Sequence, residues 1–76
     1  MKDATVVIAD KVRGLAAENH LTQQSIADII GRDRKAVHER WHGRVPFSGA
    51  ELFAIAQATG TPINRLFPEV IAERAA

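Results

Sequence analysis

Residues 21–43 read LTQQSIADIIGRDRKAVHERWHG, and this stretch decides the fold. Thr22 is a strong N-cap for a short helix, because its hydroxyl can accept an unpaired backbone N–H. Gly31 ends that helix where a positive φ is needed, and Asp33 caps a second short helix. Two short helices joined by a tight glycine-containing turn predict a helix-turn-helix over about residues 22–43.

The flanking sequence also carries helix signals, without strand-like alternation of useful length. Asp3 caps a first helix that ends near Asn19, since asparagine tolerates the left-handed conformation. Ser48 and Glu51 have the spacing of a capping box at the start of a fourth helix. The prediction is an all-α, compact five-helix bundle, with helices over residues 4–18, 23–30, 34–42, 49–59 and 62–67.

Length and composition limit the class of protein. A chain of 76 residues fits a single domain, residues 1–76, whose tail over residues 69–76 either adds a helical turn or frays. The absence of cysteine excludes disulfides and thiolate metal sites. No apolar run approaches the roughly 18 residues of a membrane span, and Asp10 and Lys11 interrupt the N-terminal apolar run. We therefore expect a soluble, cytoplasmic protein with no membrane partner.

Positive charge is concentrated in one segment, although the net charge of the chain is only +1. Residues 32–44 contain five basic and two acidic side chains, a net charge of +3, whereas residues 1–31 and 45–76 each sum to −1. One basic segment between two weakly acidic ones is typical of a surface that binds phosphate. A solvated, charged helix face is the alternative explanation.

The helix after the turn carries the groups that would read DNA. It begins with Arg34, Lys35 and Ala36, and its first half projects outward if the turn is open. Arginine and lysine donate to guanine O6 and N7, and an alanine methyl can contact a thymine methyl. The predicted partner is therefore double-stranded DNA, recognised through the major groove.

The same residues resemble a known family. The run LTQQSIADIIG, residues 21–31, resembles the second helix and turn of the Cro/phage-repressor (XRE) family, and residues 37–67 resemble its later course. Residues 44–56 look like actinobacterial and mycobacteriophage members, and the resemblance covers roughly residues 8–68. It implies a lambda-repressor-like fold and a transcriptional regulator of the phage Cro or immunity-repressor kind, acting in a bacterial or phage-infected cell on an operator-like site.

The resemblance also implies roles for single positions. Gln23, at the start of the second helix, stands in the slot that usually binds phosphate. Arg34, Lys35 and Glu39 stand in the base-reading slots, with His38 adjacent. The full set of expected DNA-binding residues is Gln23, Arg32, Arg34, Lys35, His38, Glu39, Arg40 and Arg44, of which Arg32, Arg40 and Arg44 are expected to contact the phosphate backbone.

Two positions depart from the family pattern. Many relatives carry tryptophan and then glutamate late in the third helix, where this chain has Arg40 and Trp41. The usual glutamate–arginine pair to the first helix is then absent, although Arg13 remains. We expect Trp41 to fill core space and to leave Arg40 freer to reach phosphate. Glu39 is expected either to accept a hydrogen bond from the N4 amino group of cytosine or to form an ion pair with Lys35 or Arg40.

A second motif overlaps the third helix. The run from His38 to His42 matches the H-E-x-x-H pattern of zinc metalloproteases, in which two histidines share a helix face. A catalytic site also needs a third protein ligand and a substrate cleft, and His20 is the only other histidine. We therefore expect no enzyme, no cofactor, no metal centre and no small-molecule substrate.

Two questions stay open at this stage. Phe47, Phe53 and Phe67 are expected to lie in the core, because each falls at a helix-face or staple position.

A homodimer would use the surface of the fourth and fifth helices or the tail, with Val70 and Ile71 as candidates. The alternative function is a helical protein-interaction module, such as the antitoxin component of a toxin–antitoxin pair.

Overall fold

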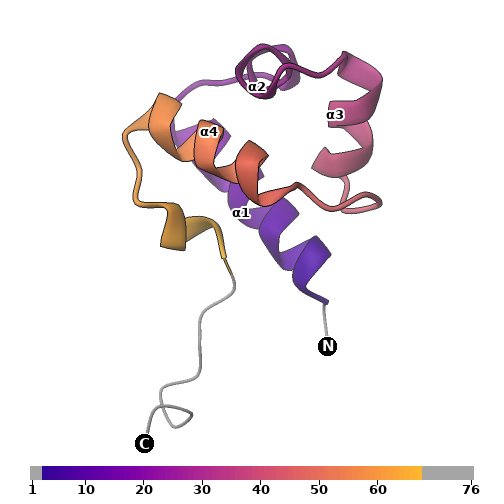
Figure 1. Cartoon of the computed structure of the whole chain (residues 1–76), viewed down its shortest axis with the longest axis horizontal. Coiled ribbons are helices and arrows are strands. Elements are labelled where there is room, and N and C mark those ends of the chain that lie inside the picture. The colour runs from indigo at the N-terminus through magenta and orange to yellow at the C-terminus, as the bar shows by residue number, and fades with distance from the viewer. Residues whose placement is uncertain (1–2, 68–76) are drawn as a thin grey trace, which may run out of the picture.

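Four α-helices and one 3₁₀ helix account for most of residues 3–67, the part of the chain that the computed structural model describes (Figure 1). The helices are α1 (Ala4–Glu18), α2 (Gln23–Ile30), α3 (Arg34–Trp41), α4 (Gly49–Thr59) and η1 (Ile63–Leu66). No strand occurs among these residues, which confirms the all-α class. None of the helices within this range is long and apolar enough to cross a membrane.

The expected fifth α-helix is a 3₁₀ turn instead, so the prediction of five α-helices was wrong by one. Its hydrogen bonds join residues three apart: the Arg65 amide donates to Pro62 at 3.1 Å and the Phe67 amide to Asn64 at 3.3 Å. Only four residues lie in this helix, too few for the longer hydrogen-bonded ring of an α-helix to propagate. The predicted tail over residues 69–76, a helical turn or a frayed end, lies outside the described residues.

Every α-helix begins at a side-chain cap, as the sequence predicted. The cap carboxylates of Asp3 and Asp33 accept the amides of Val6 at 3.0 Å and Ala36 at 2.8 Å. Thr22 forms a reciprocal capping box with Ser25, and Ser48 forms one with Glu51. These bonds satisfy amides that have no partner inside the helix, and they set where each helix starts.

A left-handed residue ends each of the four α-helices or lies in the turn that follows it; after α3 this residue is Gly43, with φ +77°. Gly31 has φ +71° at the end of α2, and Gly60 has φ +67° at the end of α4. After α1 the left-handed residue is His20, with φ +57°, and not the expected Asn19, whose φ is −104°. Asn19 instead donates from its side chain to the Leu15 carbonyl at 2.9 Å, which keeps it in the last turn of α1.

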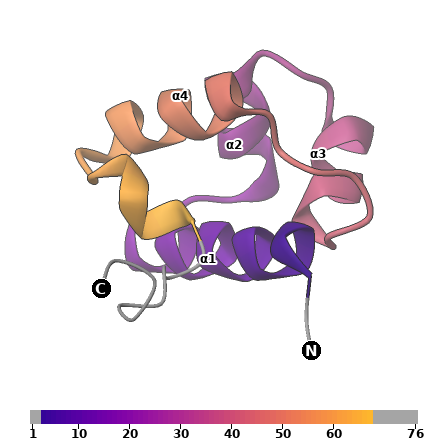
Figure 2. The same cartoon turned by 60° about the horizontal axis from the view of Figure 1, so that its bottom comes forward.

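The core lies where α1, α2 and α4 face one another, with α3 packed at one end and η1 at the other (Figure 2). Its fully buried large side chains are Val12, Ile26, Val37, Leu52, Ile55 and Leu66. Phe47 is also buried, but Phe53 and Phe67 are 53% and 39% exposed, so the core prediction for these two was wrong. Phe53 lies on the side of α4 opposite Ile55, because two residues along an α-helix correspond to a little more than half a turn. The buried face of α4 is formed by Glu51, Leu52, Ile55 and Ala56.

The glycine at the turn and the glycine inside α1 are expected to respond oppositely to alanine. Gly31→Ala forces a side chain into the left-handed region and should lower the free energy of unfolding by about 1–2 kcal/mol. Gly14→Ala, inside α1 with no atom within 4 Å of an added Cβ, should raise it by about 1 kcal/mol. Chemical denaturation of both variants checks the pair, and equal changes of the same sign would contradict the assigned turn.

Candidate nucleic-acid interface

The outer face of α3 carries cations that no other described residue neutralises. Arg34 and Lys35 are exposed at the start of the helix, directly after the turn, and within residues 3–67 neither side chain forms an ion pair. The opposite face is anchored by Val37, which is fully buried. Because the buried side fixes the rotation of the helix about its axis, the Arg34 and Lys35 side chains point to solvent.

His38 and Glu39 continue this outer face. His38 is exposed, and Glu39 is partly exposed and accepts from Arg44, with Oε2 3.2 Å from Nη1. Glu39 therefore pairs with Arg44 in this structure and not with Lys35 or Arg40, the two partners that the sequence suggested. Arg44 follows α3 and its side chain is 58% exposed, so this surface pair is weak and can open to other partners.

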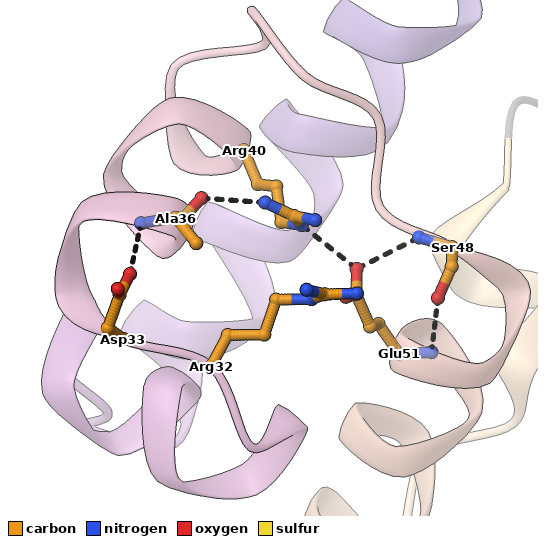
Figure 3. Close-up of polar contacts among 6 residues, drawn as sticks. All are labelled: Arg32, Asp33, Ala36, Arg40, Ser48 and Glu51. Carbon is orange, nitrogen blue, oxygen red and sulfur yellow. Dashed lines mark hydrogen bonds and ion pairs between the residues drawn. The ribbon is translucent and has the colours of Figure 1, made fainter.

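Arg40 does not lie on the outer face, and the expectation that it is free to reach phosphate was wrong. Its side chain is only 13% exposed, with Nε 3.0 Å from Glu51 Oε1 and Nη1 3.0 Å from the Ala36 carbonyl (Figure 3). Both guanidinium contacts are made inside the protein. The reason is a buried carboxylate on α4, a partner that no local sequence pattern in α3 reveals.

That carboxylate is Glu51, which is 6% exposed and binds two arginines from different segments. Arg32, in the turn between α2 and α3, donates to Oε2, and Arg40 donates to Oε1 (Figure 3). The same oxygen Oε1 accepts the Ser48 amide at 2.9 Å, as the capping box predicted. One side chain thus joins the turn, α3 and the start of α4.

The environment of Glu51 keeps it ionised. Burial by itself raises the pKa of its carboxyl, but the Ser48 amide and the Arg32 and Arg40 guanidiniums lower it by more, so the net pKa lies below the usual 4.5. Arg32 is 49% exposed in spite of its contact with Glu51. Its guanidinium is therefore held in place by the carboxylate while part of the side chain stays accessible to solvent.

Gln23, a predicted phosphate-binding residue, and Arg13, the α1 arginine of the family's usual pair, both lie outside α3. Gln23 is the first residue of α2, beside the Thr22 cap, and is half-buried. Arg13 of α1 donates to the backbone carbonyl of Trp41 and pairs with Asp10. Arg13 therefore still links α1 to the end of α3, although the glutamate that many relatives carry is replaced by Trp41. The backbone carbonyl of Trp41, at the helix C-terminus, accepts the hydrogen bond instead.

The H-E-x-x-H run forms a close histidine pair, which no third candidate metal ligand joins within residues 3–67. The rings of His38 and His42 lie 4.4 Å apart between centroids, at 63° to each other. Partial desolvation, followed by the charges of His38, Arg44 and Arg13, lowers the pKa of His42 below its usual 6.5, which favours the neutral ring. Residues 3–67 contain no group of three or more side chains that could hold a metal ion.

A groove of about 360 Å³ lies elsewhere, between the turn and the start of α4. Its walls include Ile30, Arg32, Ala50, Glu51 and Ala54, and no residue of the histidine run lines it. The two histidines therefore do not border this groove.

Comparison with known proteins identifies the fold. No protein-family model and no curated protein sequence matches the chain. The restriction-modification controller protein C.AhdI from Aeromonas hydrophila matches with a TM-score of 0.73 and 25% identity over 83% of this chain and 96% of C.AhdI. The clp gene regulator ClgR from C. glutamicum matches with a TM-score of 0.77 and 17% identity, over 87% and 86% of the two chains.

An enzyme also contains this fold. Hydroxypropylphosphonic acid epoxidase from S. wedmorenis matches with a TM-score of 0.75 and 22% identity, over 88% of this chain but only 36% of the epoxidase. The two regulators are matched over most of their length, whereas the enzyme is matched over about a third. The fold is therefore that of helix-turn-helix transcription regulators, which confirms the helix-turn-helix prediction.

Glu51→Gln is expected to destabilise the protein, because it leaves Arg32 and the largely buried Arg40 without a counter-charge. We expect a loss of about 2–3 kcal/mol in the free energy of unfolding at pH 7. Since the pKa of Glu51 is lowered in the folded state, its stabilisation is complete above about pH 4.5 and is lost as the pH falls through the folded-state value. Urea unfolding should therefore show the variant and the parent converging as the pH falls below 4.5 and through the lowered folded-state pKa of Glu51.

Glu18→Gln is the matched control. Glu18 pairs with Arg65 at 3.5 Å, but both side chains are more than half exposed, so the change should cost less than about 0.5 kcal/mol. Equal losses in the two glutamine variants would show that the buried carboxylate has no special role.

Proposed function

We propose that this chain is a DNA-binding transcriptional regulator that reads a short double-stranded site with the outer face of α3. The observation that carries the proposal is the exposed, unneutralised pair Arg34 and Lys35 at the first turn of α3, on a fold that transcription regulators share. The major groove is about 12 Å wide and admits an α-helix. Arg34 and Lys35 then donate to guanine edges, and His38 and Glu39 lie one turn further along the same face.

Phosphate contacts would come from residues at the edges of this face. Gln23 stands at the N-terminus of α2, where the backbone amides and the helix dipole favour an anion. Arg44 is largely exposed just beyond α3, and a phosphate can replace its weak partner Glu39. Arg32 can contact phosphate only with the part of its guanidinium that Glu51 does not bind. Arg40, bound to Glu51 and only 13% exposed, is not proposed as a DNA-binding residue.

The finer assignments in the proposal rest on the sequence resemblance. They are an operator-like site, repression of the phage Cro or immunity-repressor kind, and no catalytic activity. Selection of bound duplexes from a random pool tests the operator-like site, because it reports whether DNA is bound, which bases are preferred, and whether the site is symmetric. Recovery of no preferred sequence, together with tight binding of a protein partner, would favour the interaction-module alternative.

Arg34→Ala and Lys35→Ala should each weaken binding to the selected site by about 1–3 kcal/mol and relax the preference at one base position. The reason is loss of a donor to a base edge, with no change in the interior contacts of α3. Fluorescence anisotropy with the preferred duplex and its single-base variants measures both effects. Arg65→Ala removes the same charge from η1, which lies at the opposite end of the bundle from α3, and should leave affinity nearly unchanged (Figures 1 and 2).

Arg44→Ala separates phosphate contacts from base contacts in the same assay. It should weaken all sequences alike and reduce the slope of log affinity against log salt by about 1. If the Arg34, Lys35 and Arg44 variants all bound as the parent does, α3 would not be the recognition helix.

A homodimer is proposed through the exposed face of α4. This face consists of Ala50, Phe53, Gln57 and Ala58, carries no charge, and exposes 53% of Phe53. Sedimentation velocity should show a dimer that Phe53→Asp converts to a monomer, since a carboxylate would be desolvated at the contact. Gln24→Glu adds the same charge on α2 and should keep the dimer. A parent that stays monomeric at all concentrations would contradict the proposal, as would a dimeric Phe53→Asp variant.

A further inference from the structure

We propose that His38 and His42 form a two-ligand site for a divalent transition-metal ion such as Zn²⁺, and that an ion bound there competes with DNA for the outer face of α3. The first half of this proposal is independent of DNA binding, and the second half rests on the proposed function. The observation behind it is the close pair of imidazoles on an exposed surface.

The geometry of the pair suits chelation. The His42 amide donates to the His38 carbonyl at 3.2 Å, so the helical register continues through His42 and places the two side chains one turn apart on the same side. Imidazole nitrogens bind zinc at about 2.0–2.1 Å, and an angle at the metal between square and tetrahedral then sets ring centroids roughly 4.5–5.2 Å apart. The observed 4.4 Å is nearly this separation, so side-chain rotations that aim one nitrogen of each ring at a shared ion can complete the site without moving the backbone.

Both rings are available for a ligand. Within residues 3–67 neither imidazole makes a hydrogen bond or an ion pair, and both side chains are exposed. Glu39 lies between them in sequence, but its carboxylate binds Arg44. The metal would thus keep open coordination positions, occupied by water. Since Arg44 and Arg34 repel cations nearby, we expect binding only of ions that bond strongly to imidazole nitrogen, and not of Mg²⁺.

Metal and DNA would require the same surface. Arg34, His38 and His42 follow one another at steps of four residues and therefore share one stripe of α3. A hydrated ion on this stripe stands between the helix and the base pairs, and coordinated nitrogens cannot hydrogen-bond to bases. The coupling is reciprocal, so DNA should weaken metal binding by the same factor as metal weakens DNA binding.

The first experiment titrates chelator-treated protein with ZnCl₂ by calorimetry, while NMR follows the histidine ring signals. The parent should bind one Zn²⁺, with changes at His38 and His42. His38→Asn and His42→Asn should each weaken binding at least about tenfold, because one imidazole loses the benefit of the second. His20→Asn is the matched control, since asparagine tolerates the left-handed backbone at this exposed position and binding should persist. Equal zinc affinity in all three variants would overturn the site.

The second experiment measures affinity for the preferred duplex with and without Zn²⁺. With free Zn²⁺ at ten times its dissociation constant, affinity should fall about tenfold for the parent and the His20→Asn variant, but not for His42→Asn. The same concentration of Mg²⁺ should have no effect. Unchanged or higher DNA affinity in Zn²⁺ would overturn the competition. A protein that binds zinc through His38 and His42 but binds no duplex without metal would overturn the proposed function and leave the metal site standing.

Discussion

The carboxylate of Glu51 ties together by polar contacts three segments that otherwise meet through their loops and the apolar core. It binds Arg32 in the turn, Arg40 on α3 and the amide of Ser48 before α4. A buried charge is tolerated only when it is paired and fully hydrogen-bonded, so these partners are required together. The angle between α2 and α3, on which exposure of the outer face of α3 depends, is therefore braced from α4 as well as by the backbone at Gly31.

This arrangement divides the basic segment into two kinds of cation. Arg32 and Arg40 share one interior carboxylate, with the Arg32 side chain still 49% exposed, and Arg44 pairs with Glu39 at the surface. Within residues 3–67 the pair Arg34 and Lys35 stays without a counter-charge. Net charge over residues 32–44 thus overstates what is available to a partner, and the available charge is concentrated in the first turn of α3.

The shared fold does not by itself determine activity. The same helices occur in regulators of similar length and in about a third of an epoxidase, so function has to be argued from the surface groups. The outer face of α3 presents two free cations and a pair of imidazoles 4.4 Å apart, a combination suited to nucleic acid and to imidazole-binding metals. Because a metal ion and DNA would occupy the same stripe of α3, binding of either one can be measured through its effect on the affinity for the other.

What the sequence determined is local. The starts of the four α-helices follow from Asp3, Thr22, Asp33 and Ser48, whose side chains cap amides three residues away, and the buried faces follow from helical spacing. The tertiary structure alone decided which charges are free, because Glu51 lies 19 and 11 residues beyond its two arginines. It also decided how much of α4 stays uncovered: Phe53, on the side opposite the buried face, is 53% exposed because no helix of the described residues covers that side.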